Sequence, residues 1–164
     1  MRVLGIDCGT EYTGYGIVEI CPDSRLSCLA CGAIRLSPRE PLATRLATIF
    51  SRLGALIVEH RPARVAIEDV FYAVNVKSAL KLGQVRGVAM LAASSAGLIV
   101  AEYSPLSIKC AVVGYGRAEK HQVQHMVAHL LNLAEIPEPP DAADALAIAI
   151  CDLHTVATLE RQHA

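Results

Sequence analysis

The sequence has few charged residues and no long uninterrupted apolar run. Charged residues make up 19% of the 164 residues, below the usual quarter, while 53% are hydrophobic. This balance excludes a disordered chain and predicts one compact domain with apolar surface left for a partner subunit. No stretch reaches the roughly 18 apolar residues of a membrane span, and the opening MRVLGIDCGT meets a carboxylate too early for a secretory signal. We therefore expect a cytoplasmic protein without membrane contact.

A disulfide framework is not expected either. The six cysteines are scattered, and a domain of this size needs no cross-links in a reducing compartment. Cys28 and Cys31 form a lone CxxC in an expected strand, where residues three apart point to opposite faces. Zinc is not expected there, because a structural zinc site needs four converging ligands.

An excess of positive charge is also missing. The formal net charge is −1, which is unusual for a protein that binds nucleic acid. However, residues 61–120 carry eight Lys or Arg against four acids. If four carboxylates bind metal, the rest of the chain carries −1 + 4 = +3, and bound cations attract phosphates directly. The composition therefore permits a nucleic-acid substrate.

The hydrophobic pattern predicts an α/β fold. Strands are expected at residues 2–8, 12–20 and 26–36, joined by turns short enough for an antiparallel meander. A helix (42–60), a strand (64–69), a helix (75–97) and a strand (98–103) follow, and such crossovers make the strands parallel. Further helices are expected at 104–113, 119–133 and 140–157. The prediction is a five-stranded mixed sheet, three antiparallel strands then two parallel ones, flanked by helices. We expect a single domain over residues 1–158 and a short tail at 159–164.

Four acids stand where chemistry is expected. Asp7 interrupts the apolar run of a central strand, so it is paired, hydrogen-bonded at the strand end, or binding metal. Glu68 ends the next parallel strand, about 4.8 Å away, although Asp69 is a rival that periodicity does not exclude. Asp141 and Asp144 share a face at the start of the last helix, where acids can also simply favour the helix dipole.

Together these acids form a set of oxygen ligands suited to Mg²⁺ or Mn²⁺. Two ions about 3.5–4 Å apart activate water on one side and stabilise the leaving oxygen on the other. The set therefore predicts phosphodiester hydrolysis.

Four segments carry a family resemblance: GIDCGTEYTGYG, AIEDVFYAVNVKSALKLGQVRGVA, VVGYGRAEKHQVQHMV and DAADALAIAI. In order, and over essentially the whole chain, they resemble the motifs of the RuvC family of crossover-junction (Holliday junction) endodeoxyribonucleases. The resemblance implies a ribonuclease-H-like fold and a homodimer that makes paired symmetric nicks with 5′-phosphate ends in four-way DNA junctions, during recombination and repair. It implies two Mg²⁺ ions per site, with Mn²⁺ as an alternative, and delivery of the junction by a branch-migration motor complex.

The resemblance also implies site residues. It makes Asp7, Glu68, Asp141 and Asp144 the metal ligands and so selects Glu68 over Asp69. Lys109 and Lys120 fall on family lysines near the scissile phosphate, where a cation neutralises developing charge, although each can also be a solvated surface cation. The residues expected to contact DNA are Phe71, for stacking at the junction centre, and Lys77, Lys81, Arg86, Lys109, Arg117 and Lys120.

Some positions depart from the family pattern. Cys8 replaces a proline and is expected to place a thiol beside the metal site, and Val74 stands where lysine is common. His121, His125 and His129 follow one helix face, which we interpret as an ordinary polar face. Only His125 matches the family.

Three other functions remain alternatives. The Asp-x-Gly-Thr loop beginning at Asp7 also occurs in ATP-binding domains of the actin, sugar-kinase and Hsp70 type, but those need two domains and leave Asp141 and Asp144 without a role. The chain can also be a catalytically inactive junction-binding module. The third alternative is a related nuclease that cuts RNA–DNA hybrids.

Overall fold

The computed structural model describes residues 1–69 and 75–162. The described elements follow one another as predicted, with boundaries that differ by a few residues. They are β1 (Arg2–Asp7), β2 (Tyr12–Ile20), β3 (Leu26–Arg35), α1 (Leu42–His60), β4 (Arg64–Glu68), α2 (Val76–Ser95), β5 (Ile99–Tyr103), α3 (Pro105–Val113), α4 (Lys120–Leu130) and α5 (Pro140–Gln162). The largest difference is α5, which continues to Gln162 instead of ending near residue 157.

The five strands form one mixed sheet in the order β3-β2-β1-β4-β5. The meander β1–β2–β3 is antiparallel, and β4 and β5 add to β1 in parallel. Both β1 and β4 are therefore internal strands with buried faces on both sides, which explains their nearly continuous apolar runs. The predicted fold class is confirmed.

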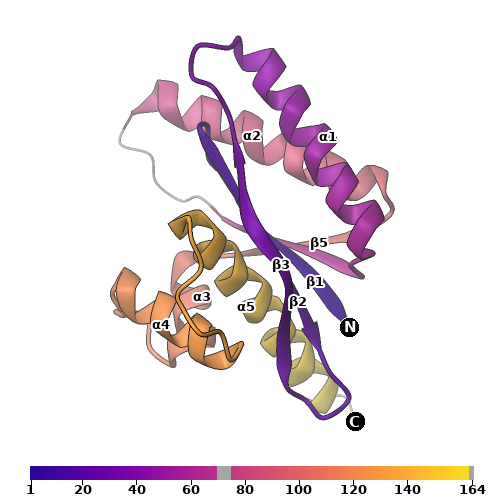
Figure 1. The fold of residues 1–164 in the computed structure, drawn as a ribbon, viewed down its shortest axis with the longest axis vertical. Coiled ribbons are helices and arrows are strands. Elements are labelled where there is room, and N and C mark those ends of the chain that lie inside the picture. Colours follow the sequence, from indigo (N-terminus) through magenta and orange to yellow (C-terminus); the bar gives the residue numbers. More distant parts are fainter. Residues whose placement is uncertain (70–74, 163–164) are drawn as a thin grey trace.

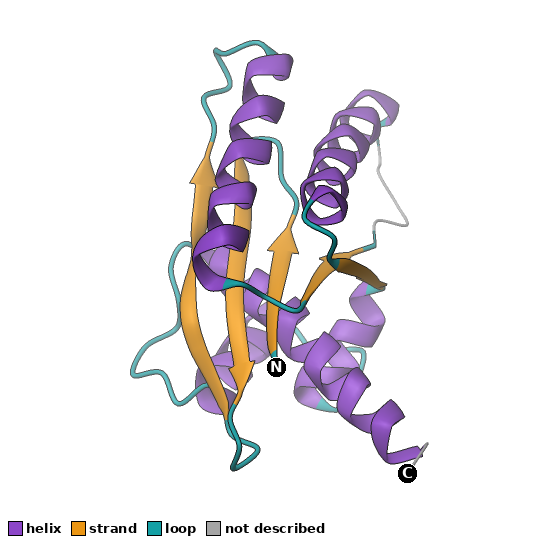
Figure 2. Ribbon diagram, turned by 90° about the vertical axis from the view of Figure 1, so that its right-hand side faces the viewer, coloured by secondary structure: helices purple, strands orange, loops and turns teal. Residues whose placement is uncertain are grey.

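Helices cover both faces of the sheet, so the molecule has two hydrophobic cores (Figures 1 and 2). One core joins β-strand residues such as Leu4 and Ile6 to α1 and α2. The other joins Val3 and Ala66 to α3, α4 and α5. Because side chains alternate along a strand, Gly5 and Asp7 lie on the α5 side together with Val3. The strand pattern thus decides which face receives the first acid.

Glycines let α5 lie very close to the sheet. A Cβ on Gly5 would stand 2.7 Å from the Ala149 amide nitrogen and would overlap the Ala145 carbonyl oxygen. Gly14 and Gly16 on β2 meet the backbone of the same helix at Asp141 and Leu146. By length and composition α5 would be apolar enough to cross a membrane, but 61% of its most apolar window is buried in this domain. It is a core helix, and its close contact with β1 and β2 fixes where its first turn stands.

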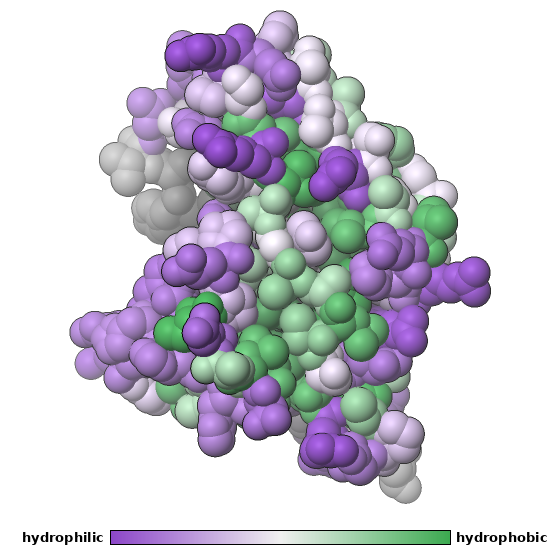
Figure 3. Space-filling model, in the orientation of Figure 1, coloured by the Kyte–Doolittle hydropathy of each residue, from purple (hydrophilic) through white to green (hydrophobic). Residues whose placement is uncertain are grey.

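A β-bulge in β3 corrects one expectation. Ile17 pairs with Ala30 and Val18 with Cys28, so Leu29 is an extra residue that shifts the alternation. Cys28 and Cys31 consequently lie on the same face, packed against the α5 core, and not on opposite faces as the regular period predicts. Burial and the neighbouring Cys31 raise the pKa of Cys28 to about 12. Leu29 is 38% exposed on this edge strand. Figure 3, drawn in the orientation of Figure 1, shows apolar surface across the middle of the molecule.

A buried ion pair fastens α5 to the parallel strands. Asp152 is fully buried and accepts two hydrogen bonds from the Arg64 guanidinium, at 2.9 and 3.0 Å, and one from the Tyr103 hydroxyl, at 2.8 Å. Each oxygen of this carboxylate therefore has a partner, as a buried charge requires. The pair joins the start of β4 and the end of β5 to the middle of α5.

Candidate metal centre at the strand ends

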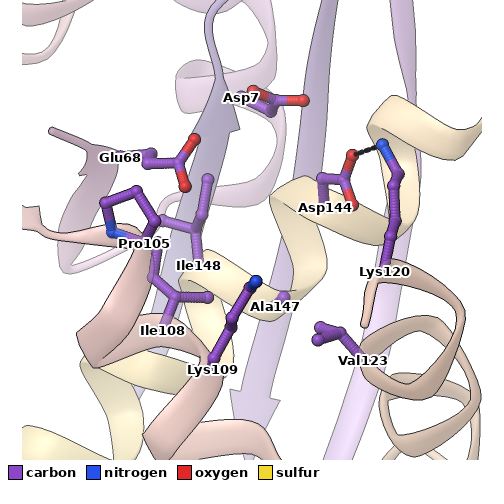
Figure 4. A pocket seen from close by; sticks show the side chains of 10 residues that line it. All are labelled: Asp7, Glu68, Pro105, Ile108, Lys109, Lys120, Val123, Asp144, Ala147 and Ile148. Atoms are coloured by element: carbon purple, nitrogen blue, oxygen red, sulfur yellow. Dashed lines mark hydrogen bonds and ion pairs between the residues drawn. The ribbon is translucent and has the colours of Figure 1, made fainter. Parts of the chain in front are cut away.

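Acids from three elements meet at one edge of the sheet. Asp7 ends β1, Glu68 ends the adjacent β4, and Asp144 projects from the first turns of α5. All three line a cavity of about 300 Å³, together with Lys109 and Lys120 (Figure 4). The floor is apolar and comes from α3, α4 and α5: Pro105, Ile108, Val123, Ala147 and Ile148. The structure thus brings together three of the four predicted acids and both predicted lysines.

The fourth acid, Asp141, does not line this cavity. It lies in the first turn of α5, three residues before Asp144. Its backbone lies close to β2, because a Cβ added to Gly14 would overlap the Asp141 carbonyl oxygen. Its charge nevertheless reaches the site, since it contributes to the raised pKa of Asp7.

The acids repel one another. Burial is the largest cause that raises the pKa of Asp7 to about 7, and the charges of Asp144, Glu68 and Asp141 raise it further. Burial and Asp144 also raise the pKa of Glu68, against the opposing charges of Lys109, Lys120 and Arg86. A carboxyl cluster of this kind is stabilised by added positive charge.

Lys120 supplies part of that charge. Its ammonium donates a 2.6 Å hydrogen bond to Asp144 Oδ2, which raises the pKa of Lys120 (Figure 4). Lys120 is the first residue of α4, whose start is stabilised by a capping box between Glu119 and Gln122. Lys109 approaches the same cavity from α3. Two helices are therefore placed so that each brings one lysine to the acids.

The donor set fits a hard divalent cation. The acids offer only carboxylate oxygens, which Mg²⁺ and Mn²⁺ prefer. In the arrangement seen here, no three carboxylate, imidazole or thiol groups in residues 1–69 and 75–162 converge tightly enough to enclose an ion. Asp144 is turned to Lys120 instead. Enclosing an ion therefore requires side-chain rotation within the cluster.

The structure separates Glu68 from Asp69, which periodicity alone does not. Glu68 lies on the same side of β4 as Ala66, in the α5 core, and enters the cavity. Asp69 follows on the opposite side, where its carboxylate stands 3.4 Å from the Arg86 guanidinium of α2. Only the first of these neighbouring acids shares the cavity with Asp7.

The predicted DNA contacts lie in different surroundings. Lys77 is exposed in the first turn of α2, Lys81 is half-buried one turn later, and Arg117 is exposed before α4. Arg86 is turned inward, with 16% of its side chain exposed, and forms ion pairs with Asp69 and Glu102. Phe71 and Val74 lie outside the described residues.

The structure also places Cys8 and the three histidines of α4. The Cys8 thiol follows Asp7 but packs against the α1–α2 core, and burial together with the charge of Asp7 raises its pKa to about 12. His121, His125 and His129 are all exposed on α4, as expected for a polar face.

Sequence reasoning missed two supporting groups. Arg64 and Asp152 form the buried ion pair that joins β4 to α5. The sequence signal for this pair was Asp152, an acid within the apolar run of the last helix. Arg45 of α1 is 8% exposed and donates a 2.8 Å hydrogen bond to the Thr10 carbonyl, in the turn that follows Asp7. A lone arginine in a helical pattern gave no signal of that contact.

Comparison with known proteins identifies the family of the chain. The family model described as "Crossover junction endodeoxyribonuclease RuvC" matches residues 3–152. The chain belongs to the RuvC family. A crossover junction endodeoxyribonuclease RuvC of Koribacter versatilis is 67% identical over 164 residues, which cover 100% of this chain and 99% of the relative. One from Heliobacterium modesticaldum is 55% identical and covers 95% of this chain and 96% of its own.

Solved structures of Holliday junction resolvases have the same fold. Thermus thermophilus RuvC in complex with a Holliday junction substrate superposes with a TM-score of 0.89 at 32% identity, covering 96% of each chain. The yeast mitochondrial Holliday junction resolvase gives a TM-score of 0.71 at 17% identity, covering 97% of this chain and 80% of its own, which shows the shared fold alone. Members of the RuvC family are metal-dependent nucleases, as predicted.

Proposed function

We propose that this protein is a Holliday junction resolvase that cuts two opposed strands of a four-way DNA junction at its carboxylate cluster. The observation that carries this proposal is the cavity at the strand ends, in which Asp7, Glu68 and Asp144 lie with two lysines. Its membership of the RuvC family and the junction complex of the Thermus relative support the substrate. An ATP-binding function is not favoured, since the acids of α5 have no role in it.

We propose that Asp7, Glu68, Asp141 and Asp144 hold two Mg²⁺ ions, for which Mn²⁺ can substitute. Bound metal supplies an activated water and stabilises charge on the phosphate oxygens. The protein contributes the fixed strand ends that orient Asp7 and Glu68, and an apolar floor that limits water in the cavity. With a cation held on Asp144, Lys120 would be free to neutralise charge on the scissile phosphate, and Lys109 would do so from α3.

Metal removal tests this proposal. Junction cleavage is expected to stop in excess chelator and to return with Mg²⁺ or Mn²⁺, because the acids are hard oxygen donors. Electrophoresis of a labelled synthetic four-way junction measures the products. Junction binding by gel shift serves as the control and should survive in Ca²⁺. Cleavage that continues in chelator contradicts a metal-dependent site.

We also infer that α2 carries the homodimer interface. Its outer face presents Val76, Leu80 and Leu91 at 77%, 65% and 56% exposure. Between them, a Cβ added to Gly83 or Gly87 would meet no atom within 4 Å, so open space at both glycines lets another helix approach closely. A second copy fits this surface because two-fold symmetry pairs the same apolar stripe with itself. The dimer places one cavity on each of two opposed junction strands.

Leu80→Glu tests the dimer. The substitution puts a charge on both sides of a two-fold interface, so dimer affinity should fall about 30-fold or more. Sedimentation velocity measures the change, and paired nicking should become single nicking. Val58→Glu on α1 is the matched control, since Val58 is 75% exposed on another helix and should leave the dimer intact. A Leu80→Glu protein that remains dimeric contradicts this interface.

The remaining contacts follow from the same substrate. We propose that Phe71, Lys77, Lys81, Lys109, Arg117 and Lys120 contact the junction, with the lysines and Arg117 on phosphates. Delivery by a branch-migration motor complex, and a place in the cytoplasm with the DNA, are the expected setting for this reaction.

A further inference from the structure

Arg86 does not present its charge to solvent as a DNA-contacting arginine would. Only 16% of its side chain is exposed, and Nη2 stands 3.4 Å from Asp69 Oδ1. The same nitrogen donates a hydrogen bond to Glu102 Oε2. Nη2 of the guanidinium therefore contacts two carboxylates of its own chain, whereas Nε is buried without a hydrogen-bond partner among the described residues.

These two carboxylates belong to the active-site ends of neighbouring parallel strands. Glu102 lies in β5 and pairs in register with Ile67, one position before Glu68 on β4. Asp69 directly follows Glu68, and its amide donates a 2.7 Å hydrogen bond to the Tyr103 carbonyl. Arg86 thus joins α2 to both strands at the point where β4 delivers its catalytic acid.

The position of Arg86 bears on which acid enters the cavity. Glu68 and Asp69 are adjacent and similar, and a slip of one residue would exchange their faces. The positive charge on the α2 side attracts Asp69 there, which leaves Glu68 on the α5 side with Asp7. The cations that face Glu68 on that side, Lys109 and Lys120, approach through the cavity itself.

We propose that Arg86 is a positioning residue that holds Glu68 in the cavity by binding Asp69 and Glu102. This inference rests on the proposed carboxylate site. This role replaces the expectation that Arg86 contacts DNA. The two roles have different consequences, so experiment can distinguish them. Loss of a phosphate contact weakens junction binding and lowers its salt dependence by about one ion. Loss of a positioning contact slows cleavage of junction that is already bound.

The experiment compares Arg86→Met, Arg86→Lys and Glu102→Gln with the unmutated protein. Single-turnover cleavage at saturating junction, junction affinity in Ca²⁺ at several salt concentrations, and the Mg²⁺ concentration for half-maximal rate are measured. Arg86→Met should cut about tenfold more slowly and need severalfold more Mg²⁺, with junction affinity and salt dependence unchanged. Arg86→Lys should recover part of the rate, since one cation remains between the two carboxylates.

Two further variants make the result decisive. Arg52→Met removes an exposed arginine of α1 and should leave rate and affinity unchanged. Glu102→Gln removes one partner at a surface position and should slow cleavage about threefold, which tests the proposal even if Arg86→Met fails to fold. Weaker junction binding with a lower salt dependence in Arg86→Met overturns the proposal, as does an unchanged rate in Arg86→Met or Glu102→Gln. Asp7→Asn is assayed beside them, because cleavage that survives this change overturns the carboxylate site itself and not the role of Arg86.

Discussion

Asp7→Asn is expected to reduce junction cleavage by about 10³-fold or more while junction binding remains. Asp7 lies at the centre of the carboxylate cluster, where it interacts with Glu68, Asp141 and Asp144. Asparagine keeps the size of the side chain but removes the charge proposed to hold a cation, so the proposed ligand set would be lost without a change of shape. Single-turnover cleavage and gel shift in Ca²⁺ separate the two effects.

Asp23→Asn is the matched control for this change. Asp23 is exposed in the β2–β3 turn, beside Arg25, and lines no part of the cavity. The substitution removes the same charge and should leave cleavage at the level of the unmutated protein. A loss of cleavage in both variants would show that net charge, and not the carboxylate site, controls the rate.

Asp7→Asn also changes how the stability of the metal-free protein depends on pH. The pKa of Asp7 rises from 3.8 to about 7 on folding, so the folded state binds a proton on Asp7 more tightly than the unfolded state does. The stability that follows is present below about pH 4 and is lost as the pH rises towards and through 7, by roughly 2–4 kcal/mol. Urea unfolding in chelator at pH 5 and pH 8 should show a smaller difference for Asp7→Asn than for the unmutated protein.

Gly5→Ala is expected to have the largest effect on the fold, a loss of about 3 kcal/mol or more. The added Cβ would overlap the Ala145 carbonyl oxygen and press on the Ala149 amide. Both are backbone atoms, so α5 must move away from β1. Because α5 carries Asp141 and Asp144, cleavage should fall together with stability, as measured by urea unfolding and junction assays.

Gly54→Ala provides the matched control. Gly54 lies within α1, and a Cβ there meets no atom within 4 Å. Alanine should therefore stabilise the protein slightly, by up to about 1 kcal/mol, because it is the better helix former. If both alanine variants have the same stability, the close contact of β1 and α5 is not what fixes the last helix.

The sequence was sufficient to predict the order of elements and the sheet. Apolar runs interrupted by turns showed β1 to β5, and short connections distinguished antiparallel from parallel pairing. Asp7 was conspicuous because a charge interrupts a buried strand. Asp141 and Asp144 are three residues apart on one helix, yet only Asp144 lines the cavity, and helical spacing does not give the distance to the sheet.

Other features depend on contacts that no local pattern contains. The bulge at Leu29 reverses the alternation of β3, so Cys28 and Cys31 share a face. The orientation of Arg86 depends on Asp69 and on Glu102, which is 16 residues away. A sequence shows that an arginine is basic, but only the fold shows that carboxylates already occupy it.

The most direct test of the proposed function is a strand-by-strand cleavage map of a synthetic four-way junction incubated with the protein and Mg²⁺. Each strand is labelled in turn, and the corresponding linear duplex and an RNA–DNA hybrid are treated in parallel. We predict symmetric nicks in two opposed strands of the junction, with 5′-phosphate ends and no comparable cutting of the duplex or hybrid. Equal cutting of the linear duplex or the hybrid, or junction binding without any cleavage, would contradict a junction resolvase.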